Sequence, residues 1–292
     1  MENKTLITEF YAAFSRGNAE EILQYVTDDF IMHVPGQGLN AGEYWGKEGF
    51  KKFLDNIASY GGGEFSVSVP TVAINDDVIY TREQIIMNRK ANPAEMWTLR
   101  LIMEYRLKDN LISEAWTIPM DPDIYDAFWT PGAAFKAPKS IEKSVVTINT
   151  DQSEDKVSKN FDHVEAFYHY FWKNDLNSMS KLATPDLVFT VPGSSFLAGY
   201  YQNWEGYVDF RSRLLSNVSG DKYKLEIDSI AASENEVFVK EYIRMNRSWD
   251  PEVQTSYVIL NFIMKDGMII QINDVPVDSI PYDAFFTKPV NQ

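Results

Sequence analysis

Apolar residues near the start of the chain recur at helical spacing, and the same pattern returns in the second half. They fall at i, i+3, i+4 and i+7, which places them on one face of an amphipathic helix. The first stripe is Ile7, Phe10, Tyr11 and Phe14, and its repeat is Val164, Phe167, Tyr168 and Phe171. Two further helices are expected in each half, over residues 19–26 and 47–60 and over 176–182 and 204–215.

The rest of each half alternates between apolar and polar residues, which is typical of strands. Strands are expected over residues 30–34, 65–74, 78–88, 96–107 and 111–119, and residues 187–191 repeat the first of them. Pro70 falls inside one of these runs, where a proline suits an edge strand or a bulge. Helices followed by an antiparallel meander predict an α+β fold with the helices packed on one face of the sheet.

Whole motifs also repeat at one fixed distance. Val34-Pro35-Gly36 returns as Val191-Pro192-Gly193, 157 positions later, and residues 121–128 return as 278–285. This period is far longer than the roughly 20–50 residues of a solenoid unit. We therefore predict two copies of one domain, at residues 1–136 and 160–292, joined by a polar linker at 137–159 in which residues 145–148 could pair as a short strand.

Composition removes several classes of function. The net charge of −15 argues against nucleic acid and against an anionic membrane surface, because both attract clustered Lys and Arg. The chain has no cysteine and three scattered histidines, so no metal site and no thiol nucleophile are expected. No apolar run approaches the ~18 residues of a membrane span. We expect a cytoplasmic protein without a cofactor.

The last predicted hairpin carries a family resemblance. Asn110-Leu111-Ile112-Ser113-Glu114-Ala115-Trp116-Thr117 and residues 267–274 stand where many SnoaL-like proteins read Gly-x-Ile-x-Glu-His-Trp-Asp. With the order of elements, this resembles the SnoaL-like branch of the nuclear-transport-factor-2-like superfamily over residues 3–131 and 160–289. The resemblance implies two cone-shaped sheets, each capped by three helices around an apolar pocket, arranged as an intramolecular pseudo-dimer, with a further homodimer left open.

Two glutamates are predicted to point into these cones. Strand alternation places Glu83 on the apolar face of residues 78–88, and Glu241 on the matching face of the second copy. A carboxyl group in such a setting is either shifted in pKa and functional, or satisfied by hydrogen bonds. The structural alternative pairs it with an arginine such as Arg100 or with a tyrosine hydroxyl.

Asp274 is the third candidate acid. It occupies the position where SnoaL-like cyclases place their catalytic Asp, whereas the first copy has Thr117 there. The alternative is a strand-end Asp that caps the loop before Pro276. The resemblance to ketosteroid isomerases does not extend to their catalytic residues, because Val34 and Val191 replace the Asp that those enzymes place before the strand-ending Pro.

A second set of residues is expected to line the pockets and bind substrate. These are His169, Tyr168, Asn273, Trp116, Asn261, Tyr11 and Trp204. Several of them differ between the copies, which predicts that the second cone is active and the first is an altered twin. The repeated Met-Asn-Arg motifs, ending in Arg89 and Arg247, are expected either to stabilise a turn or to pair with an anionic substrate.

Two functions remain open at this stage. The first is cofactor-free acid/base chemistry, namely cyclisation, dehydration or isomerisation, on a small apolar or polyketide-like substrate, with Asp274, Glu241 and Glu83 as acids or bases. The second is a non-catalytic ligand-binding or scaffold protein with degenerate sites. An apolar cavity that holds an unpaired carboxyl group would favour the enzyme.

Overall fold

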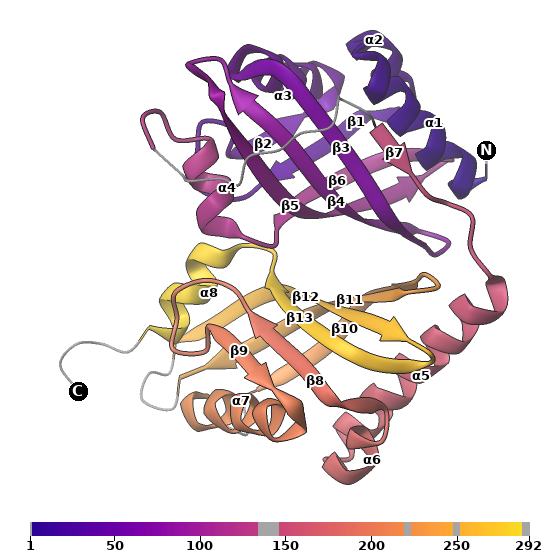
Figure 1. The fold of residues 1–292 in the computed structure, drawn as a ribbon, viewed down its shortest axis with the longest axis vertical. Coiled ribbons are helices and arrows are strands. Elements are labelled where there is room, and N and C mark those ends of the chain that lie inside the picture. Colours follow the sequence, from indigo (N-terminus) through magenta and orange to yellow (C-terminus); the bar gives the residue numbers. More distant parts are fainter. Residues whose placement is uncertain (1, 134–145, 219–222, 248–251, 288–292) are drawn as a thin grey trace. The chain divides into compact units, whose positions relative to one another are not determined.

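The computed structural model describes residues 2–133, 146–218, 223–247 and 252–287. The chain divides into two compact units, Met1–Asp151 and Gln152–Gln292. Each unit has its own curved sheet, its own helices and its own apolar core (Figure 1). The predicted α+β class is therefore confirmed in both halves.

In the first unit the helices lie over one face of the sheet (Figure 1). They are α1 (Asn3–Arg16), α2 (Ala19–Ile22), the 3-10 turn η1 (Leu23–Tyr25), α3 (Gly46–Tyr60) and α4 (Pro122–Phe128). Helix α1 buries the predicted stripe, including Ile7, Phe10 and Tyr11. The second predicted helix is shorter than expected, because β1 begins at Val26.

The first sheet has seven described strands in the order β2-β1-β6-β5-β4-β3-β7. Their bounds are β1 (Val26–Val34), β2 (Gly42–Trp45), β3 (Gly61–Ile74), β4 (Val78–Arg89), β5 (Asn92–Lys108), β6 (Leu111–Pro119) and β7 (Val146–Ile148). Strand β1 pairs with β6, and β3 with β7, in parallel; the other pairs are antiparallel. Pro70 lies at a register shift between Ser68 and Thr71, where its missing N–H costs no ladder bond.

The second unit repeats this arrangement with six described strands in the order β10-β11-β12-β13-β8-β9. Its helices are α5 (Glu154–Trp172), α6 (Leu176–Ser180), α7 (Asn203–Asn217) and α8 (Ser279–Phe286). Its strands are β8 (Ala183–Val191), β9 (Gly199–Gln202), β10 (Lys224–Ala232), β11 (Glu236–Asn246), β12 (Val253–Lys265) and β13 (Met268–Pro276).

The segment between the domains is more regular than predicted. Residues 146–148 form β7, and α5 already begins at Glu154, so the polar residues at 154–159 form the first turns of that helix. Glu154 and Asp155 lie in its first turn, where acidic side chains interact favourably with the helix dipole. The part of the predicted linker at 137–145 lies outside the described residues.

Two of the repeated motifs contact each other within each unit. The Asp283 carboxylate accepts hydrogen bonds from the backbone N–H groups of Ser194, at 2.8 Å, and Ser195, at 3.3 Å. Gly193 has a φ of 94°, and a Cβ there would lie 2.5 Å from Asp283 Oδ2. The Val-Pro-Gly turn is therefore built to receive the Asp of the repeated Tyr-Asp-Ala-Phe helix.

The third repeated motif holds the C-terminal end of the same helix. The Arg247 guanidinium donates to the carbonyl oxygens of Ala284 and Phe285, both at 2.9 Å. These carbonyls end α8, where a cation complements the helix dipole. In the first unit, Arg89 donates to the carbonyls of Thr130 and Ala133. The structure thus supports the structural interpretation of both arginines rather than the pairing with an anionic substrate.

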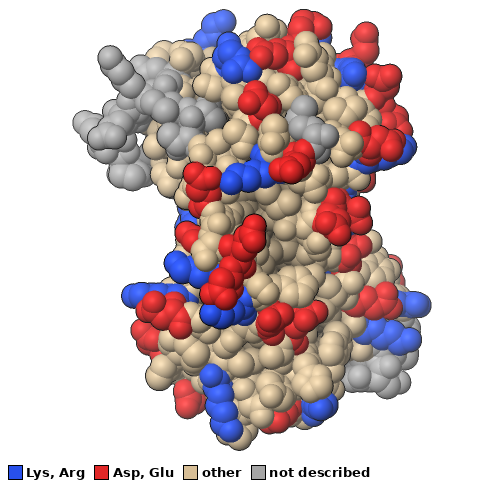
Figure 2. Space-filling model, turned by 90° about the vertical axis from the view of Figure 1, so that its right-hand side faces the viewer, with Lys and Arg blue, Asp and Glu red and all other residues tan. Residues whose placement is uncertain are grey.

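Charged side chains lie on the surface of both units. Figure 2 shows Asp and Glu side chains spread over the visible face, with Lys and Arg side chains among them. Among the described residues, no helix is long and apolar enough to cross a membrane.

Candidate functional site

The two predicted glutamates occupy equivalent places inside the two sheets. Glu83 on β4 lies opposite Leu101, and Glu241 on β11 lies opposite Val258, the residue 157 positions after Leu101. Their side chains are almost fully buried, with 6% and 3% of the residue exposed. Strand alternation therefore placed both carboxyl groups on the correct face.

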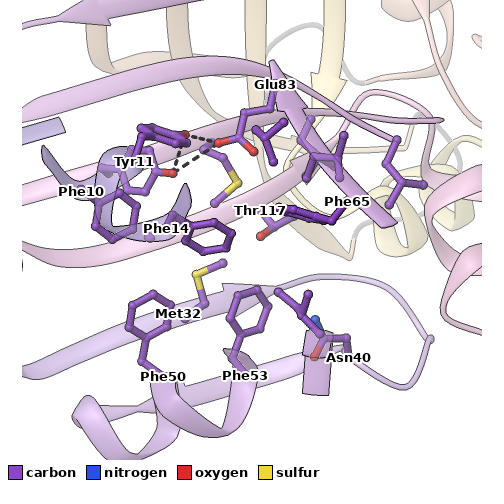
Figure 3. Close-up of a pocket in the computed structure, with 18 of the residues that line it drawn as sticks. Phe10, Tyr11, Phe14, Met32, Asn40, Phe50, Phe53, Phe65, Glu83 and Thr117 are labelled. Carbon is purple, nitrogen blue, oxygen red and sulfur yellow. Dashed lines mark hydrogen bonds between the residues drawn. The ribbon is translucent and has the colours of Figure 1, made fainter. Parts of the chain in front are cut away.

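Glu83 is held by a cluster of hydroxyl groups at one end of the first pocket (Figure 3). The Tyr11 hydroxyl donates to it from α1, and the Tyr105 and Thr81 hydroxyls lie 3.4 Å and 3.3 Å from the same oxygen. Burial raises the pKa of Glu83 to about 7, and the three hydroxyls oppose that rise. The tyrosine alternative is the one observed, since Arg100 pairs with Asp121 instead.

Glu241 has far fewer partners. The Tyr168 hydroxyl donates to it at 2.6 Å, but Val239 and Phe262 stand where the first domain has Thr81 and Tyr105. The pKa of Glu241 is raised to about 8, mainly by burial; the Tyr168 hydroxyl opposes this rise and the nearby Asp274 carboxylate adds to it. The second domain therefore leaves its glutamate easier to protonate.

Asp274 lies on β13 opposite Leu260, and only 6% of it is exposed. Its Oδ1 atom is buried and has no hydrogen-bond partner among the described residues. Burial raises the pKa of Asp274 to about 7, and the Tyr282 hydroxyl opposes that rise. Asp274 thus points into the domain instead of capping the strand end.

Glu241 and Asp274 share one large cavity in the second domain. Its volume is about 480 Å³, within the range of roughly 300–1,000 Å³ that small-molecule sites occupy. Most of its wall is aromatic or aliphatic, and Tyr207, Tyr223 and Tyr282 add hydroxyl groups. An apolar wall with a few converging polar groups is the usual form of a small-molecule site.

The two acids reach this cavity from strands that are two positions apart in the sheet. Strand β12 lies between β11 and β13, so their backbones are separated by two strand spacings, about 9.6 Å. The two acids lie on the same face of the sheet and are offset by two residues along the strands, so a ligand in the cavity can meet both of them. Such a pair can remove a proton from one atom and deliver one to another.

In the first domain the corresponding space is divided. An inner chamber of about 80 Å³ contains Glu83, and an outer groove of about 370 Å³ runs along α1 and α3. Four residues line both spaces, namely Phe14, Ile57, Phe65 and Met87. The rings of Phe14 and Phe65 lie 6.1 Å apart and stand in the middle of the pocket in Figure 3.

The residues equivalent to these four in the second domain all line its cavity of about 480 Å³. They are Phe171, Leu214, Tyr223 and Met245. The two volumes of the first domain together approach the 480 Å³ of the second. The domains therefore present one channel in two forms, closed by side chains in the first and continuous in the second.

Several residues predicted to bind substrate lie elsewhere. Asn273 and Asn261 hydrogen-bond to each other at 2.9 Å, on the face of the sheet opposite Asp274 and Leu260, because neighbours in a strand alternate. Trp116 likewise faces away from the pocket and stacks on His33, with 4.6 Å between the centres of the two rings. The prediction that these three residues line a pocket is therefore wrong.

The remaining predicted positions separate into two groups. Tyr11 lines the first pocket, and Tyr168 contacts Glu241. His169 is exposed on α5, with its ring against Tyr170, and Trp204 packs on Tyr207 at 4.9 Å without lining the cavity. The pocket role expected for His169 and Trp204 is therefore not supported.

The sequence reasoning missed three tyrosines and one arginine of the cavity. Tyr207, Phe210, Arg211 and Leu214 form one stripe of α7, and the helical spacing of these residues was the available signal. Tyr282 belongs to the repeated Tyr-Asp-Ala-Phe motif. Among the described residues, no group of three or more His, Asp or Glu side chains could hold a metal ion.

Comparisons with known proteins agree with this architecture. The sequence model of the SnoaL-like domain matches residues 7–115. No curated protein matches the sequence.

Solved structures of several proteins resemble single domains of this chain. Bal32a, from a soil-derived mobile gene cassette, is 19% identical, with a TM-score of 0.41 over 45% of this chain and 98% of its own. An NTF2-like protein of Burkholderia pseudomallei is 17% identical, with a TM-score of 0.40 over 44% and 98%. An LEH-like epoxide hydrolase of M. tuberculosis is 18% identical, with a TM-score of 0.34 over 44% and 89%. The sequence model of the SnoaL-like domain thus matches the first half of the chain, and the second half repeats the topology of the first.

Proposed function

We propose that the second domain binds a small apolar or polyketide-like substrate and catalyses cofactor-free acid/base chemistry on it, such as cyclisation, dehydration or isomerisation. The observation that carries this proposal is the pair Glu241 and Asp274 in one apolar cavity of about 480 Å³. Burial that raises the pKa of a carboxyl group allows it to act as a general acid or base near neutral pH.

The pair is suited to hold one proton between its two members. The pKa is raised to about 8 for Glu241 and to about 7 for Asp274, and two interacting acids lose their protons in separate steps. Near neutral pH the pair can therefore hold a proton on one member while the other is ionised. In an isomerisation, ionised Asp274 would take a proton from one atom of the substrate while Glu241 gives one to the oxygen where charge develops. Asp274 would then give its proton to a different atom, and Glu241 would take one back from the oxygen, which restores the pair.

The first domain favours the second candidate function, ligand binding or scaffolding without catalysis. Its inner chamber of about 80 Å³ is smaller than the 150 Å³ cavity that accepts benzene in an engineered protein. Thr117 replaces the aspartate, and three hydroxyls satisfy Glu83. A carboxyl group with that many partners is restrained for structure rather than poised for proton transfer.

Ligand identification tests the proposal directly. Native mass spectrometry of the purified chain would identify a bound small molecule, and its turnover would then be measured for Asp274→Asn, Glu241→Gln and the matched twin variant Glu83→Gln. Loss of a general acid or base lowers the rate by roughly 100- to 10,000-fold, so we expect that loss for the first two variants only. Binding with unchanged turnover in both would overturn the assignment.

A further inference from the structure

Arg211 is a cation in the wall of the second cavity. It lies on α7 and lines the cavity together with Tyr207 and Leu214. The residue is half-buried, and its guanidinium stands 5.6 Å from the centre of the Phe171 ring. It forms no ion pair with any residue in the described part of the chain, whereas Arg213, two positions later, pairs with Asp209 at 2.9 Å outside the cavity.

The cation and the acids occupy different parts of the same space. Arg211 is half-buried, whereas Glu241 and Asp274 are only 3% and 6% exposed. Two exposed residues of β10 also line this side, Lys224 and Glu226. The cavity therefore runs from a solvent-facing region that contains Arg211 to a buried region that contains the two acids.

The first domain lacks this cation. Its equivalent residue, 157 positions earlier, is Leu54, which lines the outer groove. The second domain has both Arg211 and Asp274, and the first domain has neither. Because both charged groups differ between twins that share one fold, the second cavity differs from the first in the ligand it can recognise.

We propose that the substrate of the second cavity is an anion: an apolar, ring-containing molecule whose carboxylate pairs with Arg211 while its reactive end lies between Glu241 and Asp274. This inference rests on the proposed function. A guanidinium presents two parallel N–H donors to a carboxylate, and such charge-assisted bonds are about twice as strong as neutral ones. Glu241 and Asp274 disfavour another carboxylate beside them. The ligand therefore binds with its carboxylate towards Arg211.

The test compares two probes that share one ring system and differ in charge and by one methyl group, 2-naphthoate and methyl 2-naphthoate, in calorimetric titrations of the full chain at pH 6. Arg211→Leu introduces the residue of the twin domain, and Arg213→Leu is the matched control on the same helix. We expect Arg211→Leu to weaken naphthoate binding roughly 10- to 100-fold, as for a charge-assisted hydrogen bond. The ester should change less than about twofold, as should both probes with Arg213→Leu.

Three other outcomes would contradict the anion site. Equal weakening of both probes would make Arg211 a packing residue and overturn the anion site. Tight ester binding with no preference for naphthoate would also overturn it, but would leave the proposed function intact. If neither probe binds at millimolar concentration, both proposals fail. Arg211→Lys keeps the charge and should restore part of the preference, and it replaces Arg211→Leu as the test should the latter not fold.

Discussion

Replacing Glu241 by glutamine should stabilise the second domain at alkaline pH and change it little at pH 5. The folded domain raises the pKa of Glu241 from 4.5 to about 8. Between these two values the folded state keeps a proton that the unfolded chain has lost. The stability of the wild-type protein therefore falls as the pH rises through this window. Glutamine binds no proton, so the variant loses this dependence.

The size of the effect follows from the pKa shift. One unit corresponds to 1.36 kcal/mol, so a shift from 4.5 to about 8 sets an upper limit of about 5 kcal/mol. Water that enters the cavity to solvate the carboxylate reduces this value, and we expect Glu241→Gln to exceed the wild type by about 2–5 kcal/mol at pH 9.

Urea denaturation at pH 5, 7 and 9, followed by far-ultraviolet circular dichroism, measures this difference. Glu83→Gln is the matched variant in the first domain, where the pKa reaches only about 7. The gain in free energy of unfolding of Glu83→Gln over the wild type should level off at a pH about one unit lower, and it should remain near 3 kcal/mol at most. A free-energy difference between wild type and Glu241→Gln that is the same at pH 5 and pH 9 would refute the reasoning, because Glu241 would then ionise as in the unfolded chain.

Further predictions concern the channel, the repeated motifs and the arrangement of the domains. Phe14→Ala should join the two spaces of the first domain and admit methyl 2-naphthoate there, at a cost of about 2–4 kcal/mol in urea denaturation; unchanged probe uptake would contradict this. Arg247→Met should lower stability by about 1–3 kcal/mol, because the last carbonyls of α8 lose their donor. Gly193→Ala should lower the melting temperature by several degrees, since its φ of 94° and the nearby Asp283 both oppose a side chain. The intramolecular pseudo-dimer stays a prediction, which cross-linking mass spectrometry would test.

The sequence predicted those features that depend on local periodicity. Alternation along one strand placed Glu83 and Glu241 inside, because the two-residue period of a strand is a property of the backbone. The same rule shows why Asn273 and Trp116 were wrong: each immediately precedes a residue that faces the cavity, Asp274 or Thr117, so it must face the other way. His169 follows Tyr168 on a helix, where one step turns the side chain by about 100°.

The partners of the acids could not be predicted in the same way. Whether Tyr11 reaches Glu83, 72 positions away in the sequence, depends on how α1 packs across the sheet. Three-dimensional packing also decides that the rings of Phe14 and Phe65 divide one space into two. Such contacts join distant parts of the chain, so no local period in the sequence predicts them. They become recognisable when the structures of the two domains are compared.

The substitutions between the two domains leave the second domain with more buried carboxyl groups and with fewer hydroxyl partners for them. Tyr105 and Thr81 give the first glutamate hydroxyl partners, and Phe262 and Val239 remove the equivalent hydroxyls from the second. Thr117 likewise stands where the second domain buries a carboxyl group, Asp274. A buried acid without full hydrogen bonding lowers stability, and proteins retain such groups where function needs a strained or reactive site. The second domain carries two such acids in a cavity large enough for a ligand, whereas in the first domain the acid that lines the pocket, Glu83, is hydrogen-bonded and the channel is closed. Under the proposed function, the duplication would separate stability from chemistry: one copy would serve as a stable fold, and the other would keep an open cavity with the acids that react.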